Sequence, residues 1–229
     1  MTRSRTVRGS VLALAAAFVM SSCAAHPGSA AVIGSESISA HEVDDVASAL
    51  CSAQGSSQQP GQQPQQLASR AARQGALDVL IKSSLSRQYG ESQGVQPDQE
   101  QVSAALAANA KSIGNLPAAE RPVFRRTLRA YAEGQLMLIE VGRRALTKTG
   151  AQNVTEEQAV SEGTKLRNAW AAKNVDVSVD PRFGAYAKDA LLNESGSLSV
   201  AQSQSATDGG SPDPSQGWVA SLPASQKCS

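Results

Sequence analysis

The stretch AAVIGSESISAHEVDDV, residues 30–46, decides the fold of this chain. It opens with a β-branched Val-Ile pair, and Gly34-Ser35 then allows a turn before the extended fragment SIS. Ser39 is followed three residues later by Glu42, a capping-box pattern that predicts a helix starting directly after Ser39. One short strand cannot stand alone, so the chain must supply a partner for it.

The partner is predicted near the other end of the folded body. In NVDVSVDP, Val175, Val177 and Val179 alternate with polar residues, which is typical of a half-buried strand that ends at the Asp-Pro pair. We expect this strand to pair with the segment around Ile33. That pairing would make residues 31–189 a single domain.

Between the two strands, apolar residues recur at helical spacing in five segments, which begin near residues 40, 67, 97, 118 and 155. The 67 segment should run to about Tyr89 and be broken by Gly90 to Gly94, and the 155 segment should start at a second capping box, Thr155 with Gln158. In the 118–148 segment, Gly134 and Gly142 either weaken the helix or permit close packing. The predicted fold class is mainly α: a helical bundle closed by a small two-stranded β-sheet that pairs N- and C-terminal segments.

Two segments have a composition too polar to form a core. Residues 53–66, AQGSSQQPGQQPQQ, predict a flexible surface insertion. Residues 190–229 predict a low-complexity C-terminal tail that is mobile, unless its few apolar residues and a cysteine hold it to the body. Those residues are Trp218, Val219, Leu222 and Cys228.

The first residues are typical of a targeting signal. Three arginines precede the apolar run VLALAAAFVM, and MSSC follows, so residues 1–22 predict a lipoprotein signal peptide. Cys23 would then carry the lipid (a diacylglycerol and fatty acyl chains such as palmitate), and residues 23–30 would form a tether. The alternative is an ordinary secretory signal cleaved near Ala24 or Ala25.

With Cys23 lipidated, Cys51 and Cys228 remain. Two cysteines in an exported protein predict a disulfide bond, which would contribute about 4–5 kcal/mol in the chain-entropy model. Two free thiols, or a bond to another chain, are the alternatives.

The charge of the chain excludes a general affinity for polyanions. Of 21 basic residues, three lie in residues 1–22, which hold no acidic residue, so 18 remain against 20 acidic residues, a net charge of −2. Electrostatic binding of nucleic acid is therefore not expected. The sequence contains no run of about 18 apolar residues, so no membrane-spanning helix is predicted in the mature protein.

This layout resembles the N-terminal domain of SurA-type periplasmic chaperones and related foldase lipoproteins. The matching pieces are AAVIGSESISAHEVDDV, LDVLIKSSLSRQYGESQGVQPDQEQV, RTLRAYAEGQLMLIEV and VDVSVDPRFGAY. The resemblance implies one chaperone module built from a short strand, a bundle of helices and a distant C-terminal strand. Related foldases carry a parvulin prolyl-isomerase domain before the last helix. Here that gap is residues 148–154, and the histidines are His26 and His41, so isomerase activity is not implied.

Catalytic and metal-binding patterns are not found in the sequence. It holds no G-x-S-x-G, no phosphate-binding glycine loop and no C-x-x-C. His41 and Asp45 form an i, i+4 pair, which we interpret as solvated helix residues rather than as a metal site. We predict no enzyme, no catalytic residue, no metal and no cofactor.

The leading hypothesis is a non-catalytic, ATP-independent chaperone or folding factor that binds unfolded or exported proteins in a groove between helices. It would be anchored to the extracytoplasmic face of the bacterial cell membrane through the lipid on Cys23. One alternative is a structural or assembly lipoprotein with one fixed cell-envelope partner, and another is a small-ligand-binding lipoprotein. For each candidate client-binding residue, plain core packing is the competing interpretation. These candidates are Phe124, Leu128, Tyr131, Met137 and Trp170.

Overall fold

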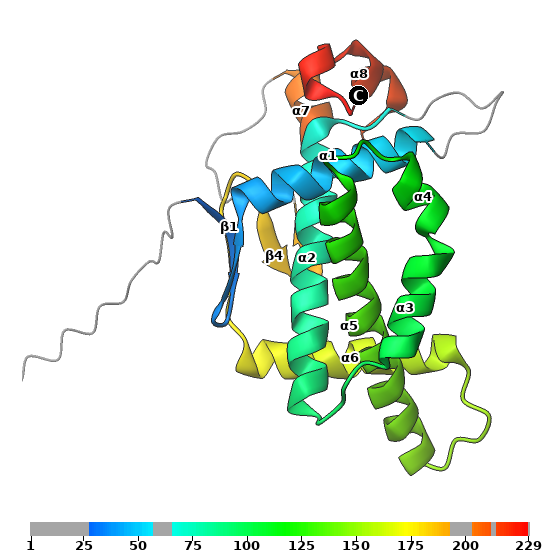
Figure 1. Cartoon of the computed structure of the whole chain (residues 1–229). Helices are drawn as coiled ribbons and strands as arrows, with labels where there is room; N and C mark the ends of the chain where they lie inside the picture. The colour runs from blue at the N-terminus through cyan, green and yellow to red at the C-terminus, as the bar shows by residue number, and fades with distance from the viewer. Residues whose placement is uncertain (1–27, 57–65, 193–202, 212–213, 229) are drawn as a thin grey trace, which may run out of the picture.

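The computed structural model describes residues 28–56, 66–192, 203–211 and 214–228 (Figure 1). In chain order its elements are β1 (Ser29–Ile33), β2 (Glu36–Ser39), α1 (Ala40–Ser56), α2 (Ser69–Ser92), α3 (Gln99–Ala108), α4 (Ala110–Asn115), α5 (Arg121–Lys148), α6 (Glu156–Asn174), β3 (Val177–Val179), β4 (Ala185–Ala187), β5 (Ala190–Leu192), α7 (Gln204–Gly210), α8 (Gln216–Ser221) and the 3-10 turn η1 (Ala224–Gln226). The chain is mainly helical, as predicted. Within the described ranges, no helix combines the length and the apolar character that a membrane crossing needs.

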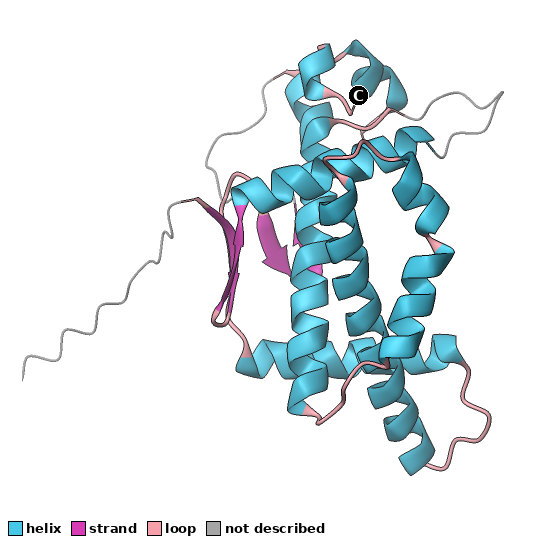
Figure 2. Ribbon diagram, in the orientation of Figure 1, coloured by secondary structure: helices cyan, strands magenta, loops and turns pink. Residues whose placement is uncertain are grey.

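The predicted pairing of the two ends of the body is present. β1 lies antiparallel to β3, with Ile33 opposite Val177 and Ala31 opposite Val179. The sheet is larger than predicted, because β2 turns back at Gly34 (φ +60°) and pairs with the other edge of β1, which gives the order β2-β1-β3 (Figure 2). Ile33 is fully buried, so the centre of this sheet belongs to the core.

Two helices begin at the predicted caps. The Ser39 hydroxyl accepts a hydrogen bond from the Glu42 backbone N–H at 3.0 Å, and α1 starts at the next residue. The Thr155 hydroxyl accepts from the Gln158 N–H, while the Gln158 side chain accepts from the Thr155 N–H, a complete capping box for α6. Each cap satisfies backbone donors that a helix start leaves free.

The bundle is built around α2 and α5, which lie side by side, while α1 and α6 cross them near opposite ends (Figure 1). Leu77, Ile81 and Leu85 of α2 are at most 2% exposed and belong to a core that also holds the sheet and α1. A second cluster joins α2, α5 and α6. It contains Tyr89, Val95, Met137, Leu138 and Val141, with Leu166 and Trp170 packed against it.

The helix boundaries differ from the prediction at two places. α2 continues through Gly90 to Ser92. Gly90 serves packing rather than helix termination, since a Cβ there would lie 2.6 Å from the Met137 sulfur. The helix expected from residue 97 is instead divided at Asn109 into α3 and α4.

The described part of residues 190–229 folds against the body. Cys51 and Cys228 form a disulfide bond, and the Cys228 backbone N–H donates to the Leu67 carbonyl at 2.8 Å. Val219 of α8 is 2% exposed. The described part of the tail is therefore held to the body, and two of the four residues expected to hold it, Val219 and Cys228, do so.

Of the predicted insertion 53–66, residues 53–56 belong to α1 and residues 57–65 lie outside the described residues. The predicted signal peptide and Cys23 also lie outside them.

Candidate functional site

One face of α2 lines three adjoining cavities of about 550, 340 and 320 Å³. Gln74 lines the first and second cavities, and Asp78 and Lys82 line the second and third, so the three follow one another along α2; together we call them the α2 groove. It extends from Arg70 to Ser86, roughly 24 Å at about 1.5 Å per residue.

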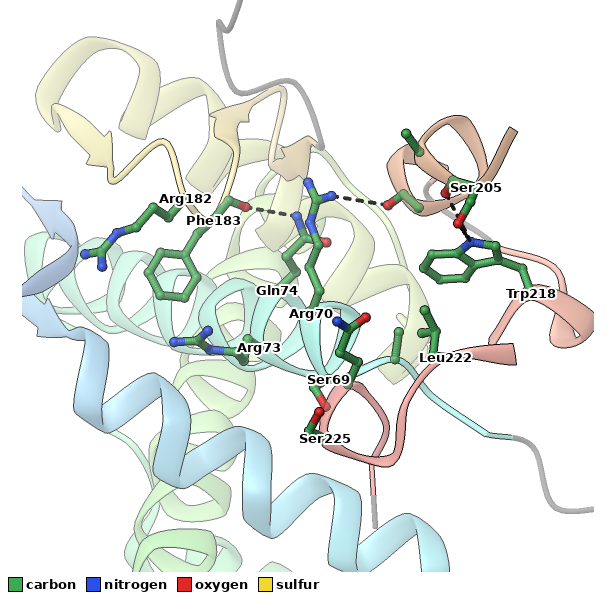
Figure 3. Close-up of a pocket in the computed structure, with 14 residues that line it drawn as sticks. Ser69, Arg70, Arg73, Gln74, Arg182, Phe183, Ser205, Trp218, Leu222 and Ser225 are labelled. Carbon is green, nitrogen blue, oxygen red and sulfur yellow. Dashed lines mark hydrogen bonds between the residues drawn. The ribbon is translucent and has the colours of Figure 1, made fainter. Parts of the chain in front are cut away.

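The first cavity of the α2 groove lies between the body and the C-terminal tail (Figure 3). The Gln74 side-chain amide donates to the Phe183 carbonyl at 3.0 Å, and Arg70 donates to the Gly209 carbonyl at 3.2 Å. On the tail side, the Trp218 indole N–H donates to the Ser205 carbonyl at 3.1 Å, which joins α8 to α7. These bonds position the Phe183 ring on one side of Arg70 and the Trp218 ring on the other (Figure 3).

Three arginines line this first cavity, and the described residues of its lining include no acidic side chain. Arg73 pairs with Asp44 at 2.6 Å and lies over the Phe183 ring, 5.3 Å from its centroid. Arg182 pairs with Asp180 at 2.7 Å, and its side-chain hydrogen bonds hold the pKa of Asp180 below the ordinary value. The cavity is therefore cationic, with two of its three arginines already paired.

The middle of the groove lies between α2 and the edge of β5. Ala71 and Gly75 form its floor, and Leu191 and Leu192 form one wall. A Cβ added at Gly75 would meet nothing within 4 Å, so a side chain at this position would project into open space. The Lys82 ammonium pairs with the Asp78 carboxylate at 2.8 Å along the same face of α2.

The third cavity is lined by residues of α2, α5 and α6, with Asp189 of the β4–β5 turn at its edge. Tyr131 of α5 lies here and is 45% exposed, so a large aromatic ring remains available to a bound molecule. Because Gly134 has no side chain, α5 lies close to α2 at this point: a Cβ at residue 134 would come within 3.0 Å of the Ser86 Cβ.

A buried ion pair holds the β4–β5 hairpin in place. Arg167 of α6, with its side chain 3% exposed, pairs with Asp189 at 2.5 Å and donates to the Ser86 hydroxyl at 3.1 Å. Asp189 and Lys188 adopt positive φ values of 62° and 52° in the hairpin turn. Asp189 also accepts from the Tyr186 hydroxyl at 2.8 Å, and burial together with this bond raises the pKa of Tyr186. The network fixes the wall of the groove to α2 and α6.

The five candidate client-binding residues do not come together. Tyr131 is the one among them that lines the α2 groove within the described part of the chain. Met137 is 2% exposed and packs against Gly90, so it lies in the core. The Trp170 ring packs on Tyr89 with 5.5 Å between centroids, and Phe124 packs against the first core cluster. Leu128 is half-buried on α5. For Met137, Phe124 and Trp170, the competing interpretation of core packing describes the contacts.

Among the described residues, no three His, Cys, Asp or Glu side chains gather as metal ligands. His41 is an exposed helix residue, with its imidazole 3.4 Å from the Asp45 carboxylate. The α2 groove itself combines paired charges, amide and hydroxyl groups, and aromatic rings at both ends.

The sequence contained one signal for this groove that the prediction did not use. Arg70, Gln74, Asp78 and Lys82 repeat at i, i+4, which marks a polar stripe on α2. A polar stripe is ordinarily a solvated face. It becomes a groove here because walls are added by residues more than 100 positions further along the chain, in the β4–β5 hairpin and in the tail.

A family model for the SurA-like N-terminal domain matches residues 2–129 of the chain. The matched region contains β1, β2 and α1 to α4, and it ends within α5. No curated protein and no solved structure matches.

Proposed function

Because the chain belongs to the family of SurA-like N-terminal domains, we propose that it is a chaperone or folding factor that binds unfolded segments of exported proteins. The observation that carries this proposal is the α2 groove, which provides a long and shallow site for a flexible chain. Its sides are formed by the tail, the β4–β5 hairpin and α5.

The dimensions of the α2 groove suit an extended segment of a client protein. At about 3.3 Å per residue, a groove of roughly 24 Å accommodates about seven residues. Aromatic rings at the two ends, Tyr131 and Trp218, would cover apolar side chains of the client. Polar groups between them would satisfy parts of the client backbone, so binding would depend little on sequence.

The protein would act by binding alone. Transient burial of apolar client segments lowers the concentration of aggregation-prone chains and needs neither a nucleotide nor a reaction. The two histidines, His26 and His41, both precede α2 in the sequence, so no isomerase-like pair is proposed for this site.

We place the protein on the extracytoplasmic face of the cell membrane, anchored through a lipid on Cys23. The Cys51–Cys228 disulfide supports an oxidising compartment, because such bonds persist mainly in exported proteins. Ser29, where β1 begins, is six positions after Cys23, and six steps of an extended chain span at most about 20 Å. The folded body would therefore remain close to the membrane surface.

An aggregation assay tests the proposal. A chemically unfolded client, such as citrate synthase diluted from denaturant, is followed by light scattering with and without the purified protein. We expect suppression that rises with protein concentration and is lost in Gly75→Trp, which fills the middle of the groove. Gly114→Trp is the matched control, because residue 114 on α4 is equally open but does not line the groove.

Two results would overturn the proposal. One is the absence of suppression by the unmodified protein. The other is equal suppression by Gly75→Trp and Gly114→Trp, which would place client binding elsewhere. Absence of suppression together with stoichiometric capture of one native envelope protein would favour the fixed-partner alternative.

A further inference from the structure

The first cavity of the α2 groove differs in charge from the rest of the groove. Among the residues that the structure describes, its lining includes Arg70, Arg73 and Arg182 and no acidic side chain, whereas Asp78 lines the second and third cavities. We propose that this end of the groove selects client segments in which an acidic residue lies beside a large apolar one, with Arg70 binding the carboxylate. The inference rests on the proposed function and names the substrate class of the same site.

Arg70 is the arginine that remains available for a ligand. Arg73 and Arg182 are each held by a carboxylate, Asp44 and Asp180 respectively. Within the described residues, Arg70 forms no ion pair and donates one bond, of 3.2 Å, to the Gly209 backbone carbonyl. A guanidinium has five N–H donors in a fork that fits a carboxylate, so most of this capacity is free for a ligand.

The apolar part of the ligand is assigned from the rings beside Arg70. Figure 3 shows Arg70 between Phe183 on one side and Trp218 with Leu222 on the other. The indole N–H of Trp218 already donates to Ser205, so the free surface of this half-buried residue is its apolar ring. Phe183 is 4% exposed and forms the base of the cavity beneath Arg73. An aromatic or leucine side chain next to the client carboxylate would rest on the Trp218 ring.

The tail wall is fixed firmly enough to act as a preformed surface. The Gln66 backbone N–H donates to the Gln216 side chain at 3.1 Å, and Lys227 forms a β-bridge with Ala68. The disulfide between Cys51 and Cys228 joins the end of this wall to α1. Preorganised walls reduce the entropy that a weakly bound segment must lose.

Tryptophan fluorescence gives a direct test, because the chain has two tryptophans and Trp170→Phe leaves Trp218 alone. The Trp170→Phe protein is titrated with the peptides GSDFLSG and GSNFLSG, which differ in one carboxylate. We expect the acidic peptide to shift the Trp218 emission and to bind about tenfold more tightly than the amide peptide. Added salt should weaken the binding of the acidic peptide and leave the binding of the amide peptide unchanged.

Variants of Arg70 test the assignment. In Arg70→Gln the preference for the acidic peptide should fall below about twofold, and in Arg70→Lys, which keeps the charge but not the fork, it should be intermediate. Arg144→Gln is the control, because Arg144 is an exposed residue on α5 that pairs with Glu140 at 2.6 Å and does not line the groove. It should keep the full preference.

Equal binding of the two peptides, or a preference that survives in Arg70→Gln, would overturn this inference. Its failure can be told apart from failure of the proposed function. If the peptides bind equally while the unfolded client still stays in solution, acid selection is wrong and the chaperone role stands. If neither peptide binds and aggregation is not suppressed, both proposals fail.

Discussion

Gly142 of α5 lies against Gly163 of α6 so closely that a Cβ at residue 142 would come within 2.8 Å of the Gly163 backbone nitrogen. The same Cβ would lie 1.9 Å from the Ala159 carbonyl oxygen, and a Cβ at residue 163 would lie 2.1 Å from the Leu138 carbonyl oxygen. Both obstructions are backbone atoms, which cannot move aside as a flexible side chain can. The crossing of α5 and α6 therefore depends on the absence of side chains at both positions.

Gly142→Ala should destabilise the protein by about 3 kcal/mol, because the added methyl group forces the two helices apart. Urea unfolding followed by circular dichroism measures the change. Gly75→Ala is the matched control: it also lies inside a helix, but its Cβ would meet nothing within 4 Å. There the higher helix propensity of alanine should leave stability unchanged or raise it by up to about 1 kcal/mol. Equal effects of the two substitutions would contradict the close crossing.

The double substitution Cys51→Ser and Cys228→Ser should lower the free energy of unfolding by up to about 5 kcal/mol, because the bond closes a loop of 177 residues in the unfolded chain. It should also loosen the tail, because the disulfide joins its end to α1. Limited proteolysis should then cut near α7 and α8 before it cuts the bundle. A double variant with unchanged stability and an unchanged cleavage pattern would show that the bond does not hold the tail.

The pKa of Tyr186 is raised by burial and by its hydrogen bond to Asp189, so the folded state keeps this hydroxyl protonated at a pH where the unfolded chain releases the proton. The contribution of Tyr186 is therefore fully present below about pH 10 and declines as the pH rises further. The decline should be smaller than about 1.4 kcal/mol per pH unit, because the residue is only half-buried.

Urea unfolding between pH 9 and pH 11 checks this prediction, and Tyr186→Phe should be less sensitive to pH than the unmodified protein. Some sensitivity should remain, since burial also raises the pKa of Tyr89. Identical pH profiles of the two proteins would exclude a role for Tyr186.

Local patterns were sufficient to predict the main elements. The β-branched residues near Ile33, the alternating valines around Val177 and the caps at Ser39 and Thr155 act over a few residues, and each produces the predicted element. The pairing of the two strands followed because each needs a partner and they flank the same set of helices.

The β4–β5 hairpin could not be predicted in the same way. Its strands are short and rich in alanine, and its turn places Lys188 and Asp189 at positive φ, where glycine or asparagine would be expected. It is held by the Arg167–Asp189 pair, which joins residues 22 positions apart. A contact of this kind leaves no periodic signal in the sequence.

The position of the α2 groove was not predicted from the sequence. Of the five residues that the sequence suggested for a groove between helices, Tyr131 lines the α2 groove. The apolar character of Met137 and Trp170 reflects the core instead, where both pack in the second cluster. The groove depends on the polar face of α2 and on walls from distant residues, Leu192 and Trp218 among them. Composition alone did not show that the tail would fold back.

Site-specific photo-crosslinking tests most directly whether unfolded chains occupy the α2 groove. A benzophenone amino acid is placed at Ala71, which lines the middle cavity, or at Ala107, an exposed position on α3 away from the groove. With a chemically unfolded client, we predict crosslinks from position 71, only background from position 107, and none from either position when the client is native. Crosslinking from position 107 that equals or exceeds that from position 71 would contradict the account.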